Sequence, residues 1–159
     1  MQKINIFLVG KQKEEYFNKA SEEYEKRLKK FCSLKITEIP AENLLNESPA
    51  LVEKALLKEA EKIKKALNLN PGFTVALCIE GKELKSEDFG ELILNSAQKS
   101  STVNFIIGSS YGIHPSVKNS ADAKISFSKM TFPHRLFKIM LLEQIYRGYK
   151  IAEGSKYHK

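Results

Sequence analysis

Residues 73–79 read Phe-Thr-Val-Ala-Leu-Cys-Ile, an almost wholly apolar run. A strand that alternates apolar and polar residues has one face in water, whereas a continuously apolar strand is typical of a sheet covered on both faces. Covered strands of this kind occur mainly in parallel sheets with helices on either side. Residues 73–79 therefore predict the centre of an α/β domain.

Strand-like and helical segments alternate on both sides of this run. Apolar β-type segments predict further strands at residues 4–9, 34–39, 103–107 and 124–127. Helical periodicity predicts helices over 16–31, 49–66, 86–97 and 133–151, with a short helical turn at 115–120. The stripe of the second helix is mostly apolar but includes Glu59. The alternation predicts one domain over residues 1–159, α/β in class, with a mainly parallel sheet and helices on both faces.

Positive charge is concentrated near the end of the 159-residue chain, whose net charge is +7. From Lys129 to Lys159, seven Lys or Arg residues stand against two Glu, which leaves this segment at +5 and the rest of the chain at +2. A basic region at one end favours a polyanionic partner such as nucleic acid. A solvated helix and tail would explain the same charge equally well.

Cysteine and hydropathy patterns argue against metal and membrane. Cys32 and Cys78 have no metal-ligand spacing, and Cys78 is expected to be a buried core thiol because its neighbours are apolar. No His, Cys or acidic cluster predicts a metal site, and His114 and His134 are expected at helix starts. No apolar stretch is long enough to span a bilayer. We therefore expect a cytoplasmic protein that binds neither membrane nor metal.

Gly81 and two loops are expected at the carboxyl ends of the strands, where open α/β sheets bind ligands. The first, Gly108-Ser109-Ser110-Tyr111-Gly112, allows close backbone approach but matches neither G-x-G-x-x-G nor a Walker loop, so it could equally be a tight turn. The second, residues 126–134, combines aromatic and methionine side chains with hydroxyl groups, the chemistry of an adenine-type pocket. A loop packed into the core is the alternative.

The final helix, residues 133–151, is apolar on almost every side. One sheet can cover only one side of such a helix, so a second copy of the chain could cover another, and we expect a two-fold dimer. Glu143 and Arg147 are four residues apart, which suits an ordinary ion pair as well as a catalytic role. In the tail that follows, His158 could accept a proton and Tyr157 could stack on a base, although most such tails are inert.

Three stretches together resemble one family: "FSKMTFPH" at 127–134, "LLEQIYRGYKI" at 141–151 and the terminal "YHK". The chain resembles the ribosomal RNA large subunit methyltransferase H family, of the SPOUT class of knotted methyltransferases. The similarity extends from "INIFLVGK" through "FIIGSSYG" to the last residue. Two departures are Ser109, where the family often has a second glycine, and Lys159, where it often has arginine. The latter keeps the charge but loses a bidentate fork.

The resemblance implies a trefoil-knotted α/β homodimer that uses S-adenosylmethionine. It implies methylation of N3 of a pseudouridine in 23S rRNA, within the assembled ribosome. The implied donor-binding residues are Leu77, Gly108, Phe127, Ser128, Lys129, Met130, Thr131 and Phe132. Tyr157, His158 and Arg147 are the implied catalytic residues, and Lys150, Lys156 and Lys159 are expected to bind RNA phosphates.

Two other functions remain compatible with the residues alone. The first is a non-catalytic RNA-binding or ribosome-associated module, in which both loops are purely structural. The second is another α/β enzyme with a nucleotide cofactor, which the lack of G-x-G-x-x-G after residues 4–9 disfavours.

Overall fold

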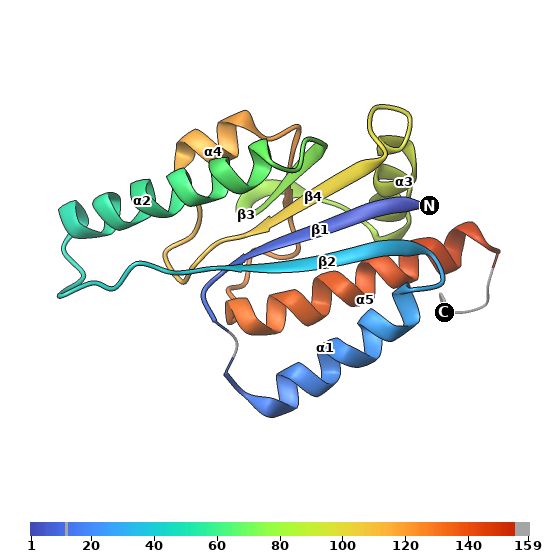
Figure 1. The fold of residues 1–159 in the computed structure, drawn as a ribbon, viewed down its shortest axis with the longest axis horizontal. Helices are drawn as coiled ribbons and strands as arrows, with labels where there is room; N and C mark the ends of the chain where they lie inside the picture. Colours follow the sequence, from blue (N-terminus) through green and yellow to red (C-terminus); the bar gives the residue numbers. More distant parts are fainter. Residues whose placement is uncertain (12, 155–159) are drawn as a thin grey trace.

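A five-stranded sheet forms the middle of the molecule, and every neighbouring pair of strands is parallel (Figure 1). The computed structural model describes residues 1–11 and 13–154. The strands are β1 (Gln2–Val9), β2 (Cys32–Ile39), β3 (Phe73–Glu83), β4 (Thr102–Ile107) and β5 (Ala123–Ser126). Their order across the sheet is β2-β1-β4-β3-β5. The sequence-based prediction of a mainly parallel α/β sheet is confirmed.

Helices cover both faces of the sheet, as predicted. They are α1 (Glu15–Leu28), α2 (Pro49–Asn68), α3 (Ser86–Ser96), α4 (Pro115–Ser120) and α5 (His134–Ala152). The helices α1, α3 and α5 pack on one face, and α2 and α4 pack on the other (Figure 1). Connections that run toward β2 use the first face and connections that run toward β5 use the second, as a uniform crossover hand requires.

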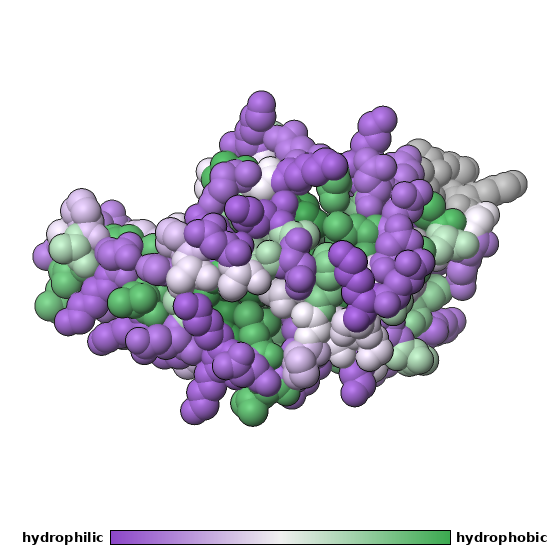
Figure 2. Space-filling view, turned by 90° about the horizontal axis from the view of Figure 1, so that it is seen from above, coloured by the Kyte–Doolittle hydropathy of each residue, from purple (hydrophilic) through white to green (hydrophobic). Residues whose placement is uncertain are grey.

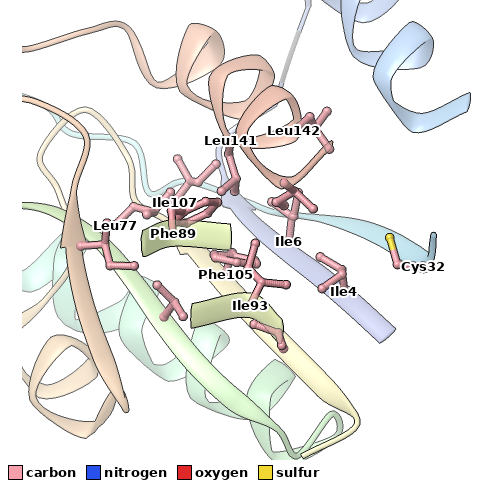
Figure 3. Packing of buried hydrophobic residues seen from close by; sticks show 14 of the residues in the cluster. Ile4, Ile6, Cys32, Leu77, Phe89, Ile93, Phe105, Ile107, Leu141 and Leu142 are labelled. Carbon is pink, nitrogen blue, oxygen red and sulfur yellow. The ribbon is translucent and has the colours of Figure 1, made fainter. Parts of the chain in front are cut away.

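The larger core lies between the sheet and the helices α1, α3 and α5. In Figure 3, Ile4 and Ile6 from β1 and Phe105 from β4 point toward Phe89 of α3 and Leu141 of α5. The smaller core, under α2 and α4, includes Ala60, Ile63 and Val117. Seen from the α2 and α4 side, hydrophilic side chains cover most of the surface and hydrophobic ones emerge in patches between them (Figure 2). None of the described helices is long and apolar enough to cross a membrane.

Helix α5 lies between two other helices rather than on the sheet alone. It contacts α1 on one side and α3 on the other, and the Cα atoms of Gly90 and Gly148 meet where α3 and α5 cross. A Cβ on either glycine would come within 2.9 Å of the opposite Cα. Much of the apolar surface of α5 is thus covered inside one chain. The argument that a second copy could cover the side of α5 away from the sheet counted too few neighbours within the chain, and the predicted dimer stays a prediction.

Strand β3 is longer than its apolar run and bends over β5. Both Leu77 and Lys82 pair with Ile125, so the residues between them form a bulge. Gly81 lies in this bulge, where a Cβ would come within 2.6 Å of the Ile125 backbone nitrogen. The bulge changes one expectation. Cys78 is only partly buried, and the fully buried cysteine is Cys32.

Side chains cap two of the helices. Ser48 caps α2 with its hydroxyl accepting from the Leu51 N–H, and His114 caps α4 with its Nδ1 accepting from the Ser116 N–H. Ser86 is the first residue of α3 and donates its hydroxyl to Gln144 Oε1 at 2.7 Å. His134 begins α5, as expected.

Candidate functional site

A cavity of about 600 Å³ opens at the carboxyl ends of β3, β4 and β5. Three segments far apart in the sequence form most of its wall, and α4 and α5 complete it. Its lining residues are Leu77, Cys78, Ile79, Glu80, residues 107–113, Lys118, Ser126, Phe127, Ser128, residues 130–134 and Phe137. Aliphatic and aromatic side chains alternate in this wall with hydroxyl groups and one ion pair, a composition suited to a small organic ligand with a few polar groups.

The Gly108–Gly112 loop forms one wall and depends on its glycines. The Gly112 N–H donates to the Ser109 carbonyl at 2.9 Å, so the loop turns back on itself. A Cβ on Gly108 would overlap the Gly112 carbonyl and come within 2.7 Å of Ile113 Cγ1. Gly112 has φ +89°, a conformation that L side chains rarely adopt. Both glycines are required for the loop, which brings main-chain atoms to the cavity surface.

The loop after β5 forms the opposite wall with aromatic side chains. The Phe127 ring stacks on Phe137 with centroids 5.4 Å apart and meets Phe89 edge-on at 6.0 Å. Phe132 contacts Phe137 edge-on at 6.1 Å. The Ser128 hydroxyl accepts from the Met130 N–H at 3.0 Å, and 68% of the Met130 surface is exposed. Packed aromatic rings therefore hold this loop at the cavity, and Met130 lies at its edge.

The first turn of α5 closes the cavity beside β1. No side chain among the described residues caps this helix, so N–H groups of its first turn can donate to an oxygen or nitrogen atom of a ligand. His134 is half-buried against Gly10, where a Cβ would lie 3.2 Å from His134 Nε2. Burial lowers the pKa of His134, so the ring is neutral at pH 7.

One ion pair lies at the cavity wall. Lys118 of α4 contacts Glu80, and both residues line the cavity. The hydrogen bond from Lys118 lowers the pKa of Glu80, which keeps its carboxylate charged. Among the described residues, no group of three or more His, Cys, Asp or Glu side chains could hold a metal ion.

Seven of the eight predicted donor-binding residues line this single cavity. They are Leu77, Gly108, Phe127, Ser128, Met130, Thr131 and Phe132, whereas Lys129 is exposed and is not among the lining residues. The sequence did not identify Cys78, Glu80, Lys118 or Phe137 as residues of the site. The strand-end rule could have pointed to residues 78–80, but the bulge that turns them toward the cavity has no clear sequence signature.

The other predicted site residues lie elsewhere. Arg147 donates to Glu143 Oε1 at 2.7 Å, the ordinary helix pair that the spacing allowed, and Lys150 pairs with Glu153 at 2.7 Å. Arg147 is ten residues beyond Phe137, the last lining residue of α5, which places it about 15 Å along the helix from the cavity. Lys156, Tyr157, His158 and Lys159 lie outside the described residues.

Comparison with known proteins decides the family. A family model described as a predicted SPOUT methyltransferase matches residues 2–158. The chain belongs to the SPOUT methyltransferase family. It is therefore an enzyme, which rules out the non-catalytic binding module.

Curated relatives match this SPOUT methyltransferase over nearly its whole length. Proteins named ribosomal RNA large subunit methyltransferase H from Clostridium botulinum (strain Kyoto / Type A2) and Clostridium kluyveri are each 45% identical over 159 residues. One of the same name from Caldicellulosiruptor bescii is 45% identical over 157 residues. Each alignment covers 98% of this chain and 99% of the relative. The family resemblance seen in the sequence is confirmed.

Proposed function

We propose that this chain methylates N3 of a pseudouridine in 23S ribosomal RNA, within the assembled ribosome, with S-adenosylmethionine as methyl donor. The observation that carries the proposal is the cavity of about 600 Å³ at the carboxyl ends of β3, β4 and β5. It brings together seven residues that the family resemblance assigned to the donor. The names of the curated relatives support ribosomal RNA as the substrate.

The residues of the cavity fit S-adenosylmethionine chemically. Aromatic side chains of Phe127 and Phe132 offer apolar surface for an adenine ring, and the Gly108 loop exposes main-chain atoms that can bind its edge. The Glu80 and Lys118 pair supplies one charge of each sign for the amino and carboxylate groups of the methionine part. The donor supplies an activated methyl group on a sulfonium, so the protein has mainly to position the acceptor.

The trefoil knot is part of the same proposal. The β3 bulge at residues 78–81 crosses β5, and the chain after β5 leads back to α5 between α1 and α3. We propose that this return path threads through the β3–α3 connection. A chain that holds both loops in this way would keep the cavity rigid.

The acceptor side is assigned to the end of the chain. His158 accepts the N3 proton or orients the base, and Tyr157 stacks on the flipped nucleotide. Arg147 contributes to the catalytic site, and Lys150, Lys156 and Lys159 bind phosphates. As the proton leaves N3, the nitrogen lone pair forms the new bond to the methyl carbon, and the carbon–sulfur bond breaks.

A homodimer would bring the donor cavity of one copy and the acceptor-binding residues of the other together. About 15 Å along α5 separates Arg147 from the cavity within one chain. We therefore propose that a partner copy supplies His158 to the cavity, in a two-fold dimer. We place the enzyme in the cytoplasm, where assembled ribosomes are found.

Labelled donor tests the whole proposal. The full chain is incubated with labelled S-adenosylmethionine and either ribosomes or naked 23S rRNA, and the methyl group is mapped. We expect label on N3 of one pseudouridine in ribosomes, loss of transfer in His158→Ala and a dimer in light scattering. No donor binding in calorimetry, label on another nucleotide, or full activity of His158→Ala would each contradict the corresponding part.

A further inference from the structure

A carboxyl group lies buried behind the Gly108–Gly112 loop. Glu59 is in the middle of α2, with only 4% of its surface exposed, next to Ala60 in the smaller core. Its Oε2 atom has no hydrogen-bond partner among the described residues. Buried polar atoms in native proteins are nearly always hydrogen-bonded, so an exception calls for a functional explanation.

The Ser109 hydroxyl is the side-chain group that faces this carboxyl. Ser109 lines the cavity, its Oγ is buried, and it too has no hydrogen-bond partner in the described part of the chain. Burial raises the pKa of Glu59, while the Ser109 hydroxyl and the Glu42 backbone act in the opposite direction. Two unsatisfied polar groups therefore lie between α2 and the cavity loop, without a hydrogen bond of normal geometry between them.

The charged residues around Glu59 do not offset the negative charge of an ionised Glu59 carboxylate. Glu42 raises the pKa of Glu59 and Lys62 lowers it, but these two residues pair with each other at 2.6 Å. Lys62 also donates to the Pro40 carbonyl at 3.0 Å. With its nearest cation engaged in this way, the buried carboxyl favours the neutral form, which can donate as well as accept a hydrogen bond.

We propose that Glu59 is a positioning residue: through Ser109 it sets the conformation of the Gly108–Gly112 loop in which the methyl donor binds. The inference rests on the proposed function, in which this cavity takes S-adenosylmethionine. A neutral Glu59 donates to Ser109 Oγ and leaves the serine hydrogen free to point into the cavity. An ionised Glu59 can only accept, so the serine hydrogen turns away from the cavity.

The pH dependence of donor binding tests this pairing. Calorimetry with S-adenosylmethionine is run on the full chain and its variants from pH 4.5, the ordinary pKa of a glutamate carboxyl, up to about pH 9, so that a rise of any size in the Glu59 pKa falls within the range. We expect wild-type affinity to fall as pH rises through the raised pKa of Glu59. Glu59→Gln should keep the low-pH affinity throughout, because an amide donates at every pH. Glu59→Leu should bind roughly tenfold more weakly at every pH, since it removes the proposed contact between the carboxyl group and Ser109.

Two further variants separate positioning from simple packing. Glu61→Gln, on the exposed side of the same helix, should keep the wild-type pH profile. Ser109→Ala should weaken donor binding, and adding Glu59→Leu to it should weaken binding no further, because the two residues act through one contact.

A readout without donor keeps the inference independent of the proposed function. The Gly112 amide donates to the Ser109 carbonyl, so its hydrogen exchange reports the loop conformation. It should exchange faster in Glu59→Leu than in wild type or Glu59→Gln. If wild type fails to bind the donor, the proposed function is wrong while the exchange result still decides the role of Glu59. An unchanged pH dependence in Glu59→Gln, or wild-type exchange in Glu59→Leu, would overturn the inference.

Discussion

The two ends of α5 have different surroundings. The N-terminal end, at His134 and Phe137, joins a cavity that one chain builds from three segments together with α4 and α5. The C-terminal end, about 15 Å further along the helix, carries Arg147 paired with Glu143 and Lys150 paired with Glu153 just beyond the helix. One chain therefore suffices for a cavity of ligand size, whereas our proposal requires an RNA and a second copy before the basic end can act at that cavity.

The largest effect is expected at the cavity end, from Gly108→Ala. The new Cβ would overlap the Gly112 carbonyl and open the loop. We expect S-adenosylmethionine affinity to fall by more than about 100-fold in calorimetry, because several ligand contacts depend on this loop. Glu91→Ala, which shortens an exposed side chain of α3, is the control and should bind normally. Normal binding by Gly108→Ala would remove the loop from the donor site.

A change at the other end should separate transfer from donor binding. Arg147→Ala should lower the methylation rate on ribosomes by about 10- to 100-fold, the loss expected for a charge-assisted contact. Donor affinity should stay within about twofold, because Arg147 is remote from the cavity. Lys26→Ala removes an exposed basic residue of α1 and should leave both quantities unchanged. A parallel loss of donor affinity in Arg147→Ala would mean that the two ends are not separate.

Gly148→Ala tests the fold of the C-terminal end without touching the cavity. Its Cβ would come within 2.9 Å of the Gly90 Cα, so α3 and α5 must move apart. Overpacking of this kind should lower the free energy of unfolding by about 1–3 kcal/mol, measured by denaturant titration. Gly90→Ala should cost a similar amount, and the double variant should cost less than their sum. If Gly148→Ala also lowered the affinity for S-adenosylmethionine, the crossing of α3 and α5 would have to shape the cavity as well.

The smallest effect concerns His134 and pH. Its folded-state pKa is lowered by burial, so the unfolded chain takes up the proton first as pH falls. Stability is therefore complete above the unfolded pKa of about 6.5 and declines as pH falls toward the lower folded value. Because the ring is only half-buried, we expect a loss below about 1 kcal/mol. Melting temperatures at pH 7.5 and 5.5 should differ less in His134→Gln than in wild type, and equal differences would contradict the assignment.

Sequence patterns predicted most helices and strands to within a few residues. Burial on both faces and helical periodicity each produce a recognisable pattern of apolar residues within one short segment. The apolar run at residues 73–79 became β3, and the loops at 108–112 and 127–133 met at one cavity because parallel strands end at the same edge. The homodimer, the knot and the roles of Tyr157, His158, Lys156 and Lys159 stay predictions.

By itself, the sequence determined the fold class, the family and most of the residues that line the cavity, since these depend on local periodicity and contiguous motifs. Only the tertiary structure decided the strand order, the β3 bulge that brings residues 78–80 to the cavity, and the outward position of Lys129. It also decided that Glu59, one charged residue in an apolar stripe, lies against Ser109 fifty residues away. Contacts of this kind arise from the packing of helices on a sheet, and no local pattern records which distant residues that packing brings together.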